Sequence, residues 1–110
     1  DKYEDGAEAL IPANLDEKET AEVQRLALEA YRVLRAEGMA RVDFLYEEGG
    51  RGPLLNEINT IPGFTPISLF PVLCGLGGHD FGATAERIVE LAHQRAALRP
   101  ARVLTRADLP

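Results

Sequence analysis

Four polar side chains near the middle of the chain have the types and spacing of a metal-binding site. Arg41 and Asp43 lie two positions apart, and so do Glu57 and Asn59. Side chains two positions apart on a β-strand point to the same face of a sheet. If the loop between the two segments is centred near Gly50, Asp43 lies opposite Glu57, and facing carboxylates repel each other. A Mg²⁺ ion would remove this repulsion, because it prefers carboxylate and amide oxygens and leaves positions for water and nucleotide phosphate.

The same four residues have two simpler explanations. Arg41 would neutralise the carboxylates if the residues formed an ordinary salt-bridge cluster. A different strand register would leave all four side chains facing water. Spacing alone therefore leaves the metal site and these alternatives open.

The segment TIPGFTP, which follows the second pair, predicts a turn that leads into a helix. Pro62 and Gly63 suit the central positions of a type II turn, and Gly63 can present its backbone N–H at close range. Ser68 suits the N-cap of the next helix, whose free N–H groups attract an anion. Helix capping is the ordinary role of such a serine, and contact with a substrate carboxylate is compatible with it.

The elements that must position these residues follow from hydrophobic periodicity and from turn residues. Asp16 and Glu19 predict a capping box at the start of a helix, and Gly38 predicts its end. Alternation with period two predicts two antiparallel strands joined by the loop EEGGRG. A short strand is also expected at 9–12. The expected helices are 17–37, 69–76 and 82–98, and the expected strands are 39–46 and 53–59.

Composition excludes several classes of protein. The 110 residues include 12 Lys and Arg, which are scattered along the chain, against 18 Asp and Glu, so a nucleic-acid surface is not expected. No apolar run is long enough to cross a bilayer. Cys74 cannot form an internal disulfide and is expected to be a buried, inert thiol. His79 and His93 are too isolated to indicate zinc.

The segments GMARVDFLY and LLNEINTIPGFTPISLFP resemble the carboxy-terminal part of D-alanine-D-alanine ligases of the ATP-grasp family. The resemblance extends from Lys2 to the last helix and is strongest over residues 38–71. It implies an α/β (α+β) fold, namely an ATP-grasp carboxy-terminal subdomain in which an antiparallel sheet with a central hairpin packs against helices. We therefore expect 1–99 to be part of an ATP-grasp ligase domain and 100–110 to be a tail.

The resemblance assigns metal and nucleotide roles to the four residues described first. It implies that Asp43 binds one Mg²⁺ ion, that Glu57 bridges two ions and that Asn59 binds the second, with Mn²⁺ as an alternative metal. Glu57 and Asn59 would thereby also contribute to binding ATP. Arg41 would stabilise charge at the reacting centre.

The resemblance also assigns roles on the substrate side. Gly63 would donate its backbone N–H to the oxyanion of the intermediate, and Ser68 with the backbone of Leu69 would hold the carboxylate of the second D-alanine. Lys2 and Tyr3 resemble the family's Lys-Tyr pair, in which Lys contacts a phosphate and Tyr favours D-alanine over D-lactate. Pro66 stands where a small polar residue is usual.

The activity implied is an ATP- and Mg²⁺-dependent ligation of two D-alanine molecules through an acyl phosphate, for peptidoglycan synthesis in the cytoplasm. The chain begins at Asp1 and contains no glycine-rich phosphate loop, so we expect it to need a missing amino-terminal part and to be inactive alone. No membrane partner is implied, and a homodimer of the full-length protein is compatible with the resemblance. The alternatives are another ATP-grasp carboxylate-amine ligase, such as a D-alanine-D-lactate ligase, and a non-catalytic nucleotide-binding fragment.

Overall fold

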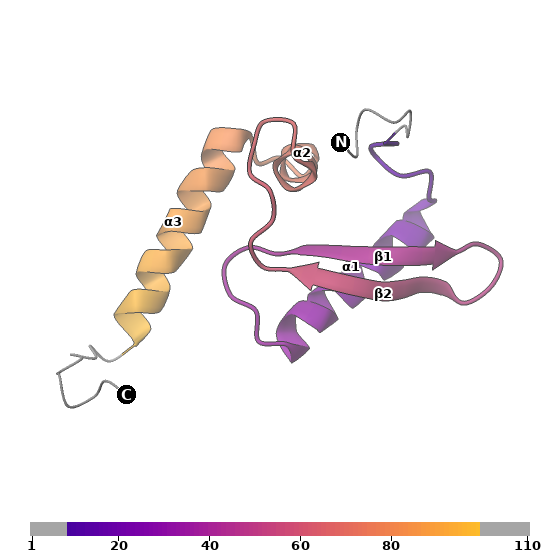
Figure 1. Ribbon diagram of the computed structural model, residues 1–110, viewed down its shortest axis with the longest axis horizontal. Coiled ribbons are helices and arrows are strands. Elements are labelled where there is room, and N and C mark those ends of the chain that lie inside the picture. The colour runs from indigo at the N-terminus through magenta and orange to yellow at the C-terminus, as the bar shows by residue number, and fades with distance from the viewer. Residues whose placement is uncertain (1–8, 100–110) are drawn as a thin grey trace.

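The computed structural model describes residues 9–99, which form three helices and a two-stranded antiparallel sheet with one helix across one of its faces (Figure 1). The elements are α1 (Glu17–Val33), β1 (Arg41–Glu47), β2 (Gly52–Asn59), α2 (Leu69–Leu76) and α3 (Phe81–Leu98). Their order and types confirm the expected α+β arrangement with its hairpin. The short strand expected at 9–12 is wrong, because these residues form a loop and bends. The expectations for Lys2 and Tyr3 lie outside the described residues.

The start of α1 is the predicted capping box. The backbone N–H of Glu19 donates to Asp16 Oδ1 over 2.7 Å, and the backbone N–H of Asp16 donates to Glu19 Oε1 over 3.0 Å. Each side chain thus satisfies a backbone donor that the first helical turn leaves without a partner.

The end of α1 comes four residues earlier than predicted. Arg35, with φ of 54°, takes the left-handed position that Gly38 was expected to fill. The N–H of Ala36 then donates to the carbonyl of Tyr31 over 3.0 Å, which closes the helix as a Schellman motif. Gly38 also has a positive φ, of 74°, but lies in the following loop, where a Cβ atom would meet Arg95 Nη1 at 2.7 Å.

The register of the hairpin places Asp43 opposite Glu57 and Arg41 opposite Asn59. This confirms the pairing expected for a loop near Gly50. The register shifts between Asp43 and Phe44, because Phe44 pairs with Leu55, so Asn56 is the extra residue of a β-bulge in the hairpin. A bulge bends the strand that contains it and increases its twist.

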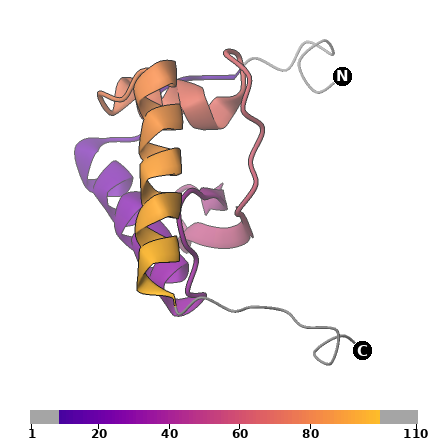
Figure 2. The same cartoon turned by 90° about the vertical axis from the view of Figure 1, so that its left-hand side faces the viewer.

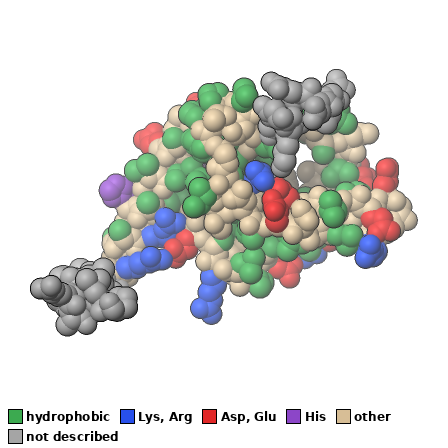
Figure 3. Space-filling model, viewed as in Figure 1, with side chains coloured by type: hydrophobic (Ala, Val, Ile, Leu, Met, Phe, Trp, Pro, Cys, Tyr) green, Lys and Arg blue, Asp and Glu red, His purple; other side chains and the backbone are tan. Residues whose placement is uncertain are grey.

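The elements pack mainly as two groups. α1 crosses one face of the hairpin and contacts β2, whereas α2 contacts α3 at the side of the sheet (Figures 1 and 2). Within residues 9–99 only Pro62, Pro71 and Thr84 are buried. Many hydrophobic side chains therefore lie at the surface (Figure 3).

Three side chains of α2 differ from their sequence-based assignments. The helical spacing of Leu73 and Leu76 predicts that both face inward, but their side chains are 48% and 59% exposed. Cys74 is half-buried rather than buried. Helical periodicity identifies the apolar face of a helix, but only neighbouring elements can bury it.

Tyr46 links the hairpin to α1 through a pH-sensitive hydrogen bond. Its hydroxyl donates to Glu19 Oε2 over 2.6 Å. This bond, burial and nearby negative charge raise the pKa of Tyr46 to about 12, from an ordinary value of 10.0. Since the pKa is raised on folding, the stabilisation is present below pH 10.0 and is lost as the pH rises to about 12.

We expect Tyr46→Phe to lower the melting temperature at neutral pH and to abolish this alkaline loss of stability. Thermal melts across the alkaline range, together with ultraviolet titration of the phenol, measure both effects. Tyr31→Phe is the matched control, because the Tyr31 hydroxyl donates to the neutral carbonyl of Gly38. A variant Tyr46→Phe that loses stability with pH as the parent does would contradict this assignment.

Candidate functional site

Arg41, Asp43, Glu57 and Asn59, here called the hairpin cluster, lie on one face of the hairpin because of the register just described. Arg41 donates from Nε to Asp43 Oδ1 and from Nη2 to Asp43 Oδ2, both over 2.9 Å. Its Nη2 also lies 3.5 Å from Glu57 Oε1. The side chains of Arg41, Asp43 and Glu57 are 22%, 33% and 56% exposed, so the cluster becomes more open toward Glu57.

Asn59 completes the hairpin cluster at the end of β2. Its Oδ1 accepts a hydrogen bond from the backbone N–H of Ile61 over 3.0 Å. This bond fixes the direction of the amide at the start of the connecting turn, residues 60–68. The amide oxygen has a second lone pair and can still accept another ligand.

The hairpin cluster suits a hard divalent cation by its donor types. The described part of the chain contains no group of three or more His, Cys, Asp and Glu side chains placed to hold a metal. The donors are instead two facing carboxylates and one amide oxygen. Mg²⁺ is commonly held by one or two carboxylates, with phosphate and water supplying the remaining ligands. The salt-bridge cluster that spacing left open is also present, since Arg41 contacts both carboxylates.

The connecting turn is organised by Ser68 and Thr65. Ser68 has the extended backbone of an N-cap, as predicted, but its side chain does not cap α2. Its Oγ accepts from the backbone N–H of Thr65 over 3.0 Å and lies 2.7 Å from Thr65 Oγ1. A Cβ atom on Gly63 would lie 3.1 Å from Ser68 Oγ, so this glycine permits the close approach. Leu69 is the first residue of α2, so its backbone lies beside Ser68.

Thr65 was missed at the sequence level. The available signal was a threonine three residues before a serine in a turn that contains proline, since such hydroxyl side chains bond to nearby backbone groups.

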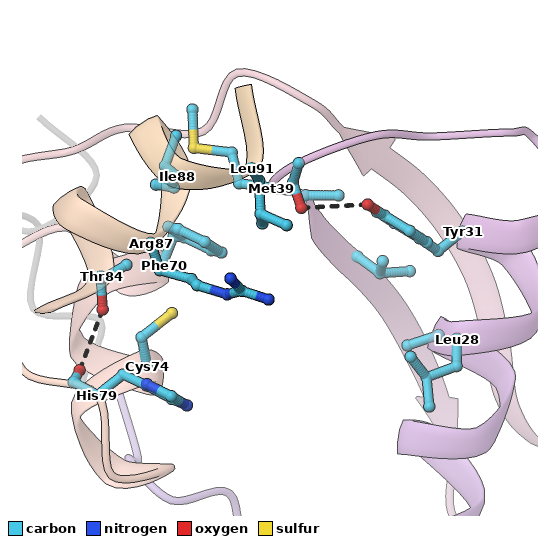
Figure 4. Close-up of a pocket in the computed structure, with 14 residues that line it drawn as sticks. Leu28, Tyr31, Met39, Phe70, Cys74, His79, Thr84, Arg87, Ile88 and Leu91 are labelled. Atoms are coloured by element: carbon cyan, nitrogen blue, oxygen red, sulfur yellow. Dashed lines mark hydrogen bonds between the residues drawn. The ribbon is translucent and has the colours of Figure 1, made fainter. Parts of the chain in front are cut away.

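The structure also contains an apolar cavity of about 430 Å³ between the two groups of elements, which the sequence did not indicate. Leu28, Tyr31, Met39, Phe70 and Leu91 line it (Figure 4). Its lining is mostly apolar, so it does not suit a phosphate or a metal ion.

A model of the family described as "D-ala D-ala ligase C-terminus" matches residues 1–90. The chain belongs to this family. The expected resemblance to the carboxy-terminal part of D-alanine-D-alanine ligases is thereby confirmed.

Relatives of this family member include D-alanine–D-alanine ligases from two bacteria. The enzyme from Pelodictyon phaeoclathratiforme is 46% identical over 101 residues, which are 91% of this chain and 28% of the relative. The enzyme from Clostridium acetobutylicum is 43% identical over 95 residues, which are 86% of this chain and 28% of the relative. The chain thus spans about 28% of the length of these relatives.

Solved structures of D-alanine–D-alanine ligases have the same fold over the matched region. The enzyme from Coxiella burnetii aligns with a TM-score of 0.79 and 36% identity, over 84% of this chain and 26% of that one. The enzyme from Bacillus anthracis complexed with ATP aligns with a TM-score of 0.72 and 26% identity, over 81% of this chain and 31% of that one. The expected fold class is therefore confirmed. No described helix is long and apolar enough to span a membrane.

Proposed function

We propose that this member of the D-ala D-ala ligase C-terminus family supplies the metal-binding and second-substrate part of an enzyme that joins two D-alanine molecules with ATP. The observation that carries the proposal is the pairing of Asp43 with Glu57 across the hairpin, with Arg41 and Asn59 on the same face. ATP-dependent carboxylate activation requires cations at the transferred phosphoryl group, and this face offers oxygen donors for them.

In this proposal Asp43 and Asn59 would each hold one Mg²⁺ ion, and Glu57 would contribute to holding both. Bound Mg²⁺ would neutralise phosphate charge during transfer to the carboxylate of the first D-alanine, and Mn²⁺ is the alternative ion. Arg41 would place its permanent positive charge beside the transferred group. Side chains held by a strand pair are well suited to this task, because positioning and electrostatics account for most of the catalysis of phosphoryl transfer.

The connecting turn forms the substrate side of the proposed site. Gly63 directs its backbone N–H to the oxyanion that forms when the second D-alanine attacks the acyl phosphate. Ser68 and the Leu69 backbone hold the carboxylate of that second D-alanine. The Thr65 contacts orient the Ser68 hydroxyl for this role.

The remaining parts of the proposal concern Lys2, Tyr3 and the longer protein. Lys2 would contact an ATP phosphate and Tyr3 would favour D-alanine over D-lactate. The first D-alanine site and the phosphate loop would come from an amino-terminal part of the same enzyme. We further propose a cytoplasmic enzyme of peptidoglycan synthesis, homodimeric at full length, in which 1–99 belong to the ligase domain and 100–110 are a tail.

A chimera tests this proposal directly. We expect a ligase from P. phaeoclathratiforme whose matching segment is replaced by this chain to release ADP only when both Mg²⁺ and D-alanine are present. The same relative with the segment deleted is the control and should release none. A folded chimera that binds ATP but releases no ADP with D-alanine would refute the proposed activity.

A further inference from the structure

Arg41 occupies one side of the Asp43 carboxylate, where both carboxylate oxygens accept its hydrogen bonds. Its two N–H groups reach the two Asp43 oxygens over 2.9 Å each, so the guanidinium lies side-on across the carboxylate. A bidentate pair of this kind is geometrically specific and stronger than a hydrogen bond between neutral groups. A metal ion that approached Asp43 from this side would compete with the pair.

The Arg41 guanidinium also forms an ion pair with the carboxylate of Glu57. Arg41 Nη2 lies 3.5 Å from Glu57 Oε1, while Asp43 and Glu57 are direct cross-strand partners. The positive charge of Arg41 thus helps to offset the repulsion that two facing carboxylates would otherwise produce. The Arg41 side chain is only 22% exposed, so solvent screens these contacts less than it screens a surface pair.

We propose that Arg41 is a displaceable counter-ion: it holds Asp43 and Glu57 together before the metal arrives and must leave Asp43 for the metal to bind. This proposal rests on the metal site proposed above and adds an exchange to it. A guanidinium and a divalent cation cannot both approach the same edge of one carboxylate without strong repulsion. Metal loading therefore releases Arg41, whose charge becomes available to a phosphate group beside the ion.

The exchange predicts that removal of the Arg41 charge strengthens metal binding, although Arg41 is proposed to serve the reaction. We expect Arg41→Gln to bind Mn²⁺ about tenfold more tightly, because a competing unit charge is lost beside a divalent ion. Arg41→Lys keeps the charge but loses the bidentate contact, so its affinity for Mn²⁺ should lie between that of the parent and that of Arg41→Gln. The measurement is the electron paramagnetic resonance signal of free Mn²⁺, titrated with the intact protein without ATP or D-alanine.

Arg51→Gln is the matched control, because Arg51 pairs with Glu47 at 2.7 Å on the same hairpin and its loss changes the net charge equally. Its Mn²⁺ affinity should equal that of the parent, and an equal gain in Arg51→Gln would overturn the proposal. Unchanged, weaker or undetectable binding in Arg41→Gln would also overturn it. If circular dichroism shows that Arg41→Gln does not fold, Arg41→Lys decides by the same criterion.

The exchange at Arg41 can be tested by Mn²⁺ binding alone, without any ligase activity. Glu57→Gln combined with Arg41→Gln should abolish the strengthened Mn²⁺ binding, which locates the ion at the hairpin cluster without any turnover. In the chimera, Arg41→Gln should lower kcat even though it tightens metal binding. An inactive chimera with strengthened Mn²⁺ binding would refute the ligase proposal and leave the exchange standing.

Discussion

Replacing Glu57 with Gln should reduce ligase activity of the chimera about a thousandfold or more, because several kcal/mol of metal-derived charge stabilisation are lost. The substitution keeps the size of the side chain and its place opposite Asp43. It removes the negative charge that is proposed to bridge two ions. The measurements are ADP release in the chimera at saturating D-alanine and Mn²⁺ binding to the intact protein.

Glu48→Gln is the matched control, since Glu48 is an exposed residue in the loop of the same hairpin. It should leave both activity and Mn²⁺ affinity unchanged. Full activity in Glu57→Gln would rule out the proposed bridging role. A loss of activity with unchanged Mn²⁺ affinity would instead mean that Glu57 serves the reaction without binding the metal.

Replacing Ser68 with Ala should lower kcat/KM for the second D-alanine by roughly 10- to 100-fold, which is the cost of losing one hydrogen bond to a charged group. The Ser68 hydroxyl already bonds to the Thr65 backbone, and its Oγ can take part in further hydrogen bonds. Because it does not cap α2, the substitution should not remove a capping interaction. Steady-state kinetics with varied D-alanine measures the effect.

Thr65→Val separates the role of Ser68 in the turn from its role toward substrate. This variant removes the hydroxyl that lies 2.7 Å from Ser68 Oγ but keeps the backbone N–H that donates to it. We expect only a severalfold loss, since the backbone bond still orients Ser68. Equal losses in Ser68→Ala and Thr65→Val would mean that Ser68 acts only by holding the turn.

The features that could be predicted from the sequence depend on residues close together in the chain. The capping box of Asp16 and Glu19 uses two residues of one helical turn, and its geometry follows from their spacing. The pairing of Asp43 with Glu57 follows from strand alternation and the position of the loop. These local rules placed the two carboxylates of the hairpin cluster correctly.

The features that could not be predicted depend on competition between alternative local conformations and hydrogen bonds, or on packing against elements distant in the chain. Arg35 ends α1 although glycine is preferred in the left-handed conformation, and the bonds of the Schellman motif offset the steric cost of a side chain there. The Ser68 side chain accepts a hydrogen bond from the Thr65 backbone and makes none to the first turn of α2. The exposure of Leu73 and Leu76 depends on which elements cover them, and local periodicity contains no such information.

Because of the bulge at Asn56, the orientation of the proposed metal ligands depends on the number of residues in β2 as well as on which residues they are. A chain without Asn56 could keep the pairing of Phe44 with Leu55 and of Asp43 with Glu57 in an unbroken ladder. Its ligands would be chemically unchanged, but the strand that carries Glu57 would be straighter. The presence of one inserted residue at this position thus changes the direction in which the strand presents Glu57. Substitution of single residues would not reproduce this change.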